Sequence, residues 1–350
     1  MAQLLLTILL GMVLTELSKN VLEADLGLKT CVYINVGARR VSSAVMNEIR
    51  ELIPQEDIYV AKSVEEEERA AIEILEKKID TLFLGGGDGT FVRFINRLIF
   101  TAGNRTLPVI GILGLGTGNA IAQLVSSGNA LSDLKSFLAN PSRDTYPLSL
   151  VETDGMVYPF GGLGWDGQWL EDYERLNTMF PEVVKGRVGY ITAFILGTIP
   201  RKLYDIVTRK HVHANIINGP HKAFRVGPNG EKADPVEPGE PIYSGNTTSV
   251  ALGTVPDYGY GIRILPFAGV DLEYMHLRVV TISMARVLLA APSVYYGVFR
   301  HPGVQDFYVK SCSVDFSKPM PFEIAGESMG RKTHVDFSVK SSRMNLLRFI

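Results

Sequence analysis

Two glycine-rich segments of the sequence carry residues that can bind phosphate. The first is Gly85-Gly86-Gly87-Asp88-Gly89-Thr90, and the second is Gly114-Leu115-Gly116-Thr117-Gly118-Asn119. Glycine lets backbone N–H groups approach a phosphate closely, and the amino terminus of a following helix adds partial positive charge. Side chains within the segments, those of Thr90, Thr117 and Asn119, can add further hydrogen bonds. Together the two segments predict a site for a phosphorylated ligand.

Asp88 is the one acid within these segments. A carboxylate beside a phosphate is unfavourable unless a cation lies between them, so Asp88 predicts Mg²⁺, bound directly or through water. A single such segment would be equally consistent with a tight turn in which Thr90 caps a helix. Two segments, one of them acidic, favour the phosphate site. Neither has the spacing of a P-loop or of a G-x-G-x-x-G dinucleotide motif.

The surrounding pattern alternates between strands and helices. Apolar runs predict strands at 29–36, 57–61, 79–85 and 107–113, and amphipathic patterns predict helices at 41–53, 64–78 and 91–100 and another that opens at 119–125. Ser63 and Glu66 have the spacing of a capping box. The short links predict a doubly wound α/β sheet, in which ligands bind at the carboxyl ends of the strands. Both glycine segments fall at such ends.

After Pro147 the sequence becomes mainly strand-like, with helical stretches at 170–197 and 284–298. The stretch from Pro220 to Gly245 is rich in proline, glycine and charge, and predicts an exposed loop. We therefore predict an α/β nucleotide-binding domain followed by a β-rich, sandwich-like second domain. The predicted divisions are an apolar extension or helix at 1–28, the α/β domain at 29–146, the β-rich domain at 147–328 and a segment at 329–350 that returns to the first domain.

Composition narrows the class of protein. The chain has 350 residues, which favours about two domains, and its formal net charge of −2 gives no indication of a nucleic-acid partner. Two cysteines, Cys31 and Cys312, cannot form a disulfide framework, and Cys31 lies in an apolar run that predicts a buried strand. This low cysteine content is compatible with a reducing, cytoplasmic compartment. His211 and His213 have no partners at metal-ligand spacing.

The amino-terminal run AQLLLTILLGMVL has 13 residues, fewer than the roughly 20 of a membrane span. It lacks the basic flank and cleavage site of a secretory signal. A helix packed on the domain, an incorrect start upstream of Met12, and a membrane-surface anchor remain alternatives at this stage. The anchor gains weight if the substrate is a lipid.

The motifs GGDGT and GLGTGNA resemble those of the diacylglycerol kinase catalytic domain and its relatives, the sphingosine kinases and bacterial lipid kinases. Asn35 resembles the family's asparagine near the first strand, and Ser63 lies near the position of a nucleotide-contacting threonine. Three later stretches also resemble family motifs: GWDG at 164–167, YYGVFRHPGV at 295–304 and PFEIAGESMG at 321–330. The asparagine-rich motif of the NAD kinases is not found. The resemblance covers roughly residues 29 to 350.

This resemblance implies ATP-dependent phosphorylation of a lipid hydroxyl, with ATP and Mg²⁺ in a cleft between the two domains. The lipid would be diacylglycerol, a sphingoid base or a related lipid, reached by peripheral association with a membrane surface. The implied nucleotide-binding residues are Asn35, Ser63, Gly86, Gly87, Asp88, Gly89, Thr90, Gly116, Thr117, Gly118 and Asn119, with Asp88 also the metal ligand. Oligomeric state is open, although exposed strands are compatible with a homodimer.

The sequence departs from the family pattern at acidic positions. Ala120 stands where diacylglycerol kinases have Asp and sphingosine kinases have Ala, and Ala325 replaces the Asp of an Asp-Gly-Glu motif. The stretch EYMHLRV lacks the acids of a structural Mg²⁺ site found in some bacterial relatives. Asp88, Asp166 and Glu327 are the remaining candidate catalytic acids. Asp88 would organise Mg²⁺ and serve as a base, Glu327 would complete the metal or water network, and Asp166 would face the cleft. The alternative function is a weak or inactive nucleotide- or lipid-binding protein on the same fold.

Overall fold

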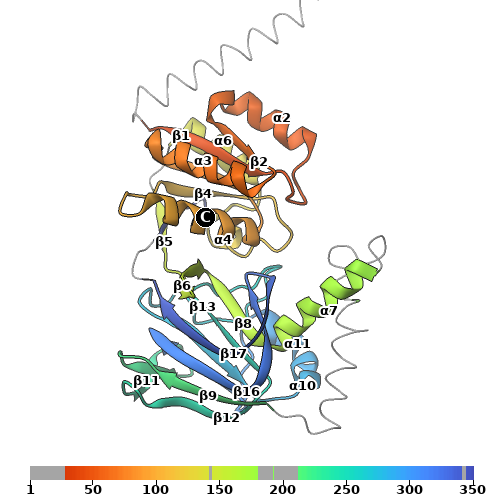
Figure 1. The fold of residues 1–350 in the computed structure, drawn as a ribbon, viewed down its shortest axis with the longest axis vertical. Helices are drawn as coiled ribbons and strands as arrows, with labels where there is room; N and C mark the ends of the chain where they lie inside the picture. The colour runs from red at the N-terminus through yellow and green to blue at the C-terminus, as the bar shows by residue number, and fades with distance from the viewer. Residues whose placement is uncertain (1–27, 142–143, 180–191, 193–211, 341–343) are drawn as a thin grey trace, which may run out of the picture. The chain divides into compact units, whose positions relative to one another are not determined.

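The computed structural model describes residues 28–141, 144–179, 192, 212–340 and 344–350. The chain divides into two compact units (Figure 1), one formed by the described residues up to Leu148 together with Met344–Ile350, and the other lying within Ser149–Arg343. The apolar run at the amino terminus and the later part of the helical stretch predicted at 170–197 lie outside the described residues.

The first unit is built on a six-stranded sheet with the order β2-β1-β3-β4-β18-β5. The five strands β2, β1, β3, β4 and β18 run parallel to one another. The edge strand β5 is antiparallel to β18. The strands are β1 (Thr30–Asn35), β2 (Ile58–Ala61), β3 (Thr81–Gly86), β4 (Val109–Gly114), β5 (Thr145–Leu148) and β18 (Met344–Leu347). The carboxyl ends of β1 to β4 therefore lie along one edge of this sheet.

Helices cover both faces of the sheet. They are α2 (Ser43–Leu52), α3 (Val64–Glu76), α4 (Asp88–Ala102), α5 (Ala122–Val125) and α6 (Ala130–Ala139), with a 3₁₀ turn at Gln55–Asp57. On one face the β1 residues Val32 and Ile34 belong to a core shared with α2 and α6. On the other face Tyr33 stacks on Phe94 of α4 with ring centroids 3.8 Å apart. This alternation confirms the predicted doubly wound α/β domain.

The residues after the second glycine loop form less helix than predicted. Only Ala122–Val125 is helical, and α6 follows separately at Ala130–Ala139 with Asn129 as its N-cap. Ser126 and Gly128, the latter with φ of 97°, separate the two helices. α6, which packs beside α2 on one face of the sheet, is therefore a helix that the sequence pattern did not single out.

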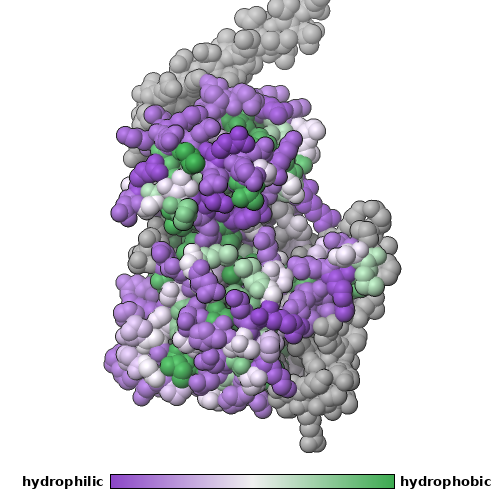
Figure 2. Space-filling view, viewed as in Figure 1, coloured by the Kyte–Doolittle hydropathy of each residue, from purple (hydrophilic) through white to green (hydrophobic). Residues whose placement is uncertain are grey.

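The described surface of the first unit is mainly hydrophilic, as expected if the apolar faces of its helices are buried against the sheet. Figure 2 shows hydrophilic residues over most of its described surface on the face drawn, with apolar residues in small separated groups. Throughout the described part of the chain, no helix combines the length and the apolar character that crossing a membrane requires.

The second unit is a twelve-stranded antiparallel sheet system, which confirms the predicted β-rich domain. Its main path runs β11-β10-β15-β14-β13-β8-β16-β17-β6-β7, and β9 joins β12 to β16. The strands are β6 (Val151–Thr153), β7 (Met156–Tyr158), β8 (Phe160–Gly164), β9 (Val212–Asn218), β10 (Ala223–Val226), β11 (Lys232–Val236), β12 (Pro241–Thr247), β13 (Ser249–Gly253), β14 (Met275–Val280), β15 (Val304–Val309), β16 (Ser311–Ile324) and β17 (Glu327–Val339). The described helices are α7 (Trp165–Met179), α10 (Met284–Leu289) and α11 (Ala291–Tyr295).

The prediction of a loop over Pro220–Gly245 is wrong, because β10, β11 and the start of β12 lie there. β11 is an edge strand whose sequence KADPV is almost entirely exposed. Proline and charge are tolerated on an exposed edge, where one side of the strand needs no partner. At the carboxyl terminus, β17 belongs to the second unit, and Met344–Leu347 alone adds a strand to the first.

A buried ion network joins β14 to β15. Arg278 and Asp306 are opposite each other in these strands, and the Arg278 guanidinium donates to both Asp306 carboxylate oxygens at 2.7 and 3.0 Å. Nε2 of His276, fully buried, lies 2.9 Å from Asp306 Oδ1. Burial alone would raise the pKa of Asp306, but the hydrogen bonds from His276 and Arg278 outweigh it and hold that pKa well below its usual range.

We expect Asp306→Asn to destabilise the second unit at pH 7 by about 3–5 kcal/mol, because it leaves the Arg278 charge buried without its partner. Since the pKa of Asp306 is depressed in the fold, its contribution is present above its unfolded pKa of about 3.9 and is lost as the pH falls. The difference between wild type and variant in urea unfolding should therefore shrink below about pH 4. A difference that stays constant from pH 7 to pH 3 would contradict this account.

Candidate functional site

The two glycine loops leave neighbouring strands at the same edge of the first unit's sheet. β3 and β4 are parallel and pair through Gly86 and Gly114, and the Leu115 amide donates to the Gly86 carbonyl at 2.9 Å. The loops then touch: a Cβ built on Gly116 would lie 2.2 Å from the Cα atom of Gly87. Position 116 therefore excludes any side chain, a Cβ on Gly87 would be tight at 3.1 Å from the Gly116 Cα atom, and the backbones of the two loops lie directly against each other.

Asn119 holds the second loop in shape. Its Oδ1 accepts from the Gly116 amide at 3.0 Å, and its Nδ2 donates to the carbonyls of Gly114 and Gly116 at 3.0 and 3.1 Å. Its φ of 53° lies in the left-handed region, where asparagine is tolerated. The side chain that the sequence analysis offered to a phosphate therefore makes its observed hydrogen bonds within the loop, and Asn119 acts there as a positioning residue.

Asp88 begins α4, and Gly87 is the N-cap of that helix. The Asp88 carboxylate accepts from the Ile121 amide at 3.1 Å, which ties the first loop to the residues after the second. Burial raises the pKa of Asp88 above its ordinary value, while backbone amides of residues 119–121 oppose the shift. The acid thus lies where both loops meet the amino terminus of a 15-residue helix.

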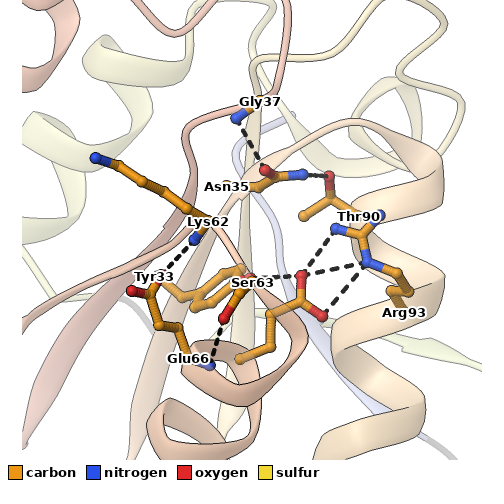
Figure 3. Close-up of polar contacts among 9 residues, drawn as sticks. Tyr33, Asn35, Gly37, Lys62, Ser63, Glu66, Thr90 and Arg93 are labelled. Carbon is orange, nitrogen blue, oxygen red and sulfur yellow. Dashed lines mark hydrogen bonds and ion pairs between the residues drawn. The ribbon is translucent and has the colours of Figure 1, made fainter.

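Asn35 and Thr90 are brought together from distant parts of the sequence (Figure 3). Asn35 ends β1, and its Nδ2 donates to Thr90 Oγ1 at 2.8 Å while its Oδ1 accepts from the Gly37 amide at 2.9 Å. Thr90 is buried in the first turn of α4, and a Cβ on Gly86 would lie 2.5 Å from the Thr90 side chain. The two predicted polar residues therefore join β1 to the first glycine loop.

Ser63 serves as the N-cap of α3 at the carboxyl end of β2. Its Oγ accepts from the Glu66 amide at 3.3 Å, and the Glu66 carboxylate accepts from the Lys62 amide at 2.6 Å (Figure 3). The reciprocal bond reaches Lys62 and not the Ser63 amide, so the capping box is displaced by one residue. The observed hydrogen bonds give Ser63 a capping role in this structure.

Several basic side chains near this edge were not assigned a role from sequence. Arg39 and Arg40 follow β1 and are exposed, and the Arg40 amide donates to the Leu115 carbonyl of the second loop at 2.9 Å. Lys62 is exposed after β2. The two adjacent arginines of the run GARR could have indicated this role from the sequence, because cations near a glycine loop favour phosphate binding.

Beneath these residues, a buried acid joins the helices α3 and α4. Glu67 accepts from the Tyr33 hydroxyl at 3.0 Å and from Nη2 of Arg93 at 2.8 Å (Figure 3). Glu67 is only 7% exposed, so this pairing compensates for the burial of its charge. The network fixes α4, and with it Asp88 and Thr90, against β1 and α3.

The other two predicted acids belong to the second unit and lie on different elements, α7 and β17. Asp166 is in the first turn of α7, where its Oδ1 accepts from the Gly167 amide at 3.0 Å and the Ser249 hydroxyl at 3.3 Å. Glu327 is exposed at the start of β17, and its charge acts on Glu174, further along α7. Eight residues of helix separate Asp166 from Glu174, a rise of about 12 Å.

Ala325 and Gly326 form the turn before Glu327. Both have positive φ, 49° and 82°, the backbone requirement of a type I′ hairpin turn. Asp-Gly is a favoured sequence for this turn, so an acid at residue 325 would also have a local structural reason. Ala325 adopts the positive φ of this turn without an aspartate side chain.

A cavity of the first unit lies away from the glycine loops. It has a volume of about 820 Å³ and is lined by Thr81 and Val109 at the amino ends of β3 and β4, together with Ile74, Arg105 and Asn345. The loops lie at the opposite ends of these strands. At the loops themselves there is only a small hollow, lined by Gly86, Gly87, Asp88 and Asn119 among others.

We expect Asn119→Ala to lower the melting temperature of the first unit, because it removes three loop hydrogen bonds and places alanine at a positive φ. The cost should be about 1–3 kcal/mol. Thermal unfolding of the variant checks this, with Asn104→Ala in an exposed turn as the matched control. A decrease in melting temperature no larger than that of the control would contradict the role of Asn119 as a positioning residue.

Comparison with known proteins agrees with this geometry. Residues 29–146 match the family model described as the diacylglycerol kinase catalytic domain. Among solved structures, one described as a diacylglycerol kinase from Bacillus anthracis str. Sterne is similar with a TM-score of 0.59 and 14% sequence identity, covering 92% of this chain and 97% of that chain. A candidate diacylglycerol kinase from the same organism has a TM-score of 0.60 and 17% identity, with the same coverage.

No curated protein matches the chain at the significance required. At these identities the solved structures establish the fold, which extends over both units. The family match covers the α/β unit that carries both glycine loops, Asp88 and the Asn35–Thr90 pair. Residues 29–146 of this chain therefore match the diacylglycerol kinase catalytic domain, and both units share the fold of the solved structures.

Proposed function

We propose that this protein is an ATP-dependent lipid kinase, which transfers the γ-phosphate of ATP to a hydroxyl group of a lipid. The observation that carries the proposal is the direct contact between two glycine loops at neighbouring strand ends, with Asp88 at their junction. The family assignment supports a kinase. The lipid acceptor, ATP as donor and association with a membrane surface are parts of the proposal.

The first unit would hold the triphosphate mainly through its backbone. Gly87 and Gly116 carry no side chain, and a side chain is sterically excluded at Gly116, so a phosphate can approach the amide groups around them. The amino terminus of α4 adds its partial positive charge, which favours an anion. The Asn35–Thr90 hydrogen bond fixes the first loop, and Asn119 fixes the second. The exposed cations Arg39 and Lys62 would attract the charged ligand.

The residues present fit a magnesium ion that arrives with the nucleotide. Mg²⁺ is usually bound by one or two carboxylates together with phosphate oxygens and water. Among the described residues, no group of three or more His, Cys, Asp or Glu side chains could hold a metal on its own. Asp88 would therefore be the protein ligand, at the point where both loops meet. The ion, when bound, neutralises charge on the transferred phosphoryl group.

A second candidate is a protein that binds nucleotide or lipid without turnover. The specific observation in its favour is that Ala120 and Ala325, where some relatives carry acids, are buried and have no polar side chain to offer. Asp88 argues for the kinase, because a carboxylate beside a phosphate has a clear use when a metal ion is bound. The roles of Asp166 and Glu327, and a ligand cleft between the domains, stay predictions.

The decisive experiment is transfer of labelled phosphate from ATP to a panel of lipids in detergent micelles with Mg²⁺. The panel contains diacylglycerol, a long-chain base, ceramide and a monoacylglycerol. We expect label in one class, and a loss on the order of 100-fold or more in Asp88→Asn, because the variant lacks the charge that holds the metal. Its amide oxygen can still accept from the Ile121 amide, so the fold should persist.

Asp154→Asn is the matched control, because Asp154 is 77% exposed and adopts a positive φ that asparagine tolerates. It should keep the wild-type rate. Absence of label in every lipid, from wild-type protein that binds ATP, would contradict the kinase and favour the binding protein. Label that persists unchanged in Asp88→Asn would contradict the role of Asp88.

A further inference from the structure

The segment that contains α10 and α11 carries an uncharged run bounded by two arginines. Residues 287–299 include no charged side chain, and Arg286 and Arg300 stand at the two ends of this run of 13 residues. No aspartate or glutamate occurs between Glu273 and Asp306. The run overlaps the stretch YYGVFRHPGV, to which the nucleotide site of the first unit assigns no role. Its composition therefore requires an explanation in packing or in binding.

Apolar side chains of this run face solvent. Leu289 is 87% exposed, Tyr296 69%, Val298 64% and Tyr295 44%, and we call these four residues the apolar patch. They are four of the ten large apolar side chains that are exposed in the described part of the chain. The rings of Tyr295 and Tyr296 meet edge to face, with their centroids 5.2 Å apart. Single exposed apolar residues are common, but a group of them indicates an interaction surface.

Hydrogen bonds and close packing hold the apolar patch in this exposed position. The Arg263 amide donates to the Tyr295 carbonyl at 3.1 Å, and the Val298 amide donates to the Ser293 carbonyl at 2.9 Å. Gly297, with φ of 70°, lies against Arg263, because a Cβ there would be 2.6 Å from the arginine Cγ. The segment is thus folded onto the loop that precedes β14, and the fold itself directs these side chains outward.

The arginines at the two ends give this surface a positive charge. Arg286 and Arg300 are exposed, and neither forms an ion pair with another described residue. The Arg300 guanidinium donates to the Gly297 carbonyl at 3.0 Å, which holds its charge beside the apolar patch. Arg263 is also exposed, but it pairs with Asp257 at 3.5 Å and adds no net charge. The surface thus combines aromatic and aliphatic side chains with two cations.

We propose that the apolar patch, with Arg286 and Arg300, is a docking surface for an anionic lipid bilayer. Tyrosine is favoured at the boundary of a bilayer because its ring is apolar and its hydroxyl is polar, and arginine attracts anionic headgroups. A run of 13 residues is shorter than the roughly 20 of a membrane span, so the patch would enter only the interface. This inference deepens the proposed function, since a lipid acceptor is reached at such a surface.

A second copy of this chain fits the surface less well than a bilayer does. A two-fold interface places the same patch of both subunits face to face. Two segments that each carry Arg286 and Arg300 and contain no acid would then repel each other. A bilayer with anionic headgroups supplies the opposite charge over its whole surface.

Co-sedimentation with lipid vesicles tests the proposal on the full chain, without ATP or an acceptor lipid. Vesicles of phosphatidylcholine are compared with vesicles that also contain phosphatidylglycerol. We expect wild type to bind the anionic vesicles, and the double variant Leu289→Ser/Tyr296→Ser to bind about tenfold more weakly, because it removes apolar area that enters the interface. Arg286→Gln should weaken binding to the anionic vesicles about fivefold and leave binding to phosphatidylcholine unchanged.

Val270→Ser and Lys318→Gln are the matched controls. Val270 is 67% exposed and Lys318 is exposed, and both belong to the second unit but lie outside the apolar patch. Both controls should bind vesicles as wild type does. The replaced side chains are all exposed, so every variant should keep its melting temperature within a few degrees of wild type.

Equal binding by wild type and Leu289→Ser/Tyr296→Ser, or no binding of wild type to either kind of vesicle, would overturn this inference. A wild-type dimer that becomes monomeric in the double variant, without vesicle binding, would overturn it and assign the surface to a second copy. Wild type that binds anionic vesicles through the patch but phosphorylates no lipid would support this inference and contradict the proposed kinase.

Discussion

The direct contact between Gly87 and Gly116 is the constraint on which the candidate site depends. A Cβ atom on Gly116 would lie 2.2 Å from the Cα atom of Gly87, so the second loop cannot carry a side chain where the two loops meet. The parallel pairing of β3 with β4 brings the loops to the same edge. The hydrogen bond that the Ile121 amide donates to Asp88, and those that Asn119 makes within its loop, then hold them there. The sheet core, α4 and the Glu67 network all serve to keep this backbone surface in place.

The architecture of the first unit could be predicted because local patterns and tertiary packing agree there. The runs at 29–36 and 79–85 are apolar on both faces, as parallel strands between two helix layers must be, and Ser63 marks the start of α3 by its capping chemistry. The segment after the second loop was harder, since α5 spans only Ala122–Val125. Exposed edge strands also escaped prediction: β11 carries proline and charge because its outer side needs no partner.

The acids of the second unit show what a sequence pattern cannot supply. Motif resemblance pointed to Glu327 and to the missing acid at Ala325, both beside a hairpin turn, and the structure places Glu327 in solvent. Glu323, a buried acid of β16, comes two residues before Ala325 and lies opposite Gly162, and the charge of Asp166 acts on it. That proximity depends on the register between β16 and β8, strands about 160 residues apart in the sequence. No local spacing encodes it, so only the fold brings the two carboxyls together.

The central claim is that the two loops and Asp88 bind a nucleotide together with a metal ion. Calorimetric titration of ATP into the wild-type protein, once with Mg²⁺ and once with a chelator, tests it most directly. The account predicts that Mg²⁺ tightens ATP binding by about tenfold or more, because the Asp88 carboxylate is unfavourable beside phosphate without a cation. Equal affinity under both conditions, or tighter binding in the chelator, would contradict it.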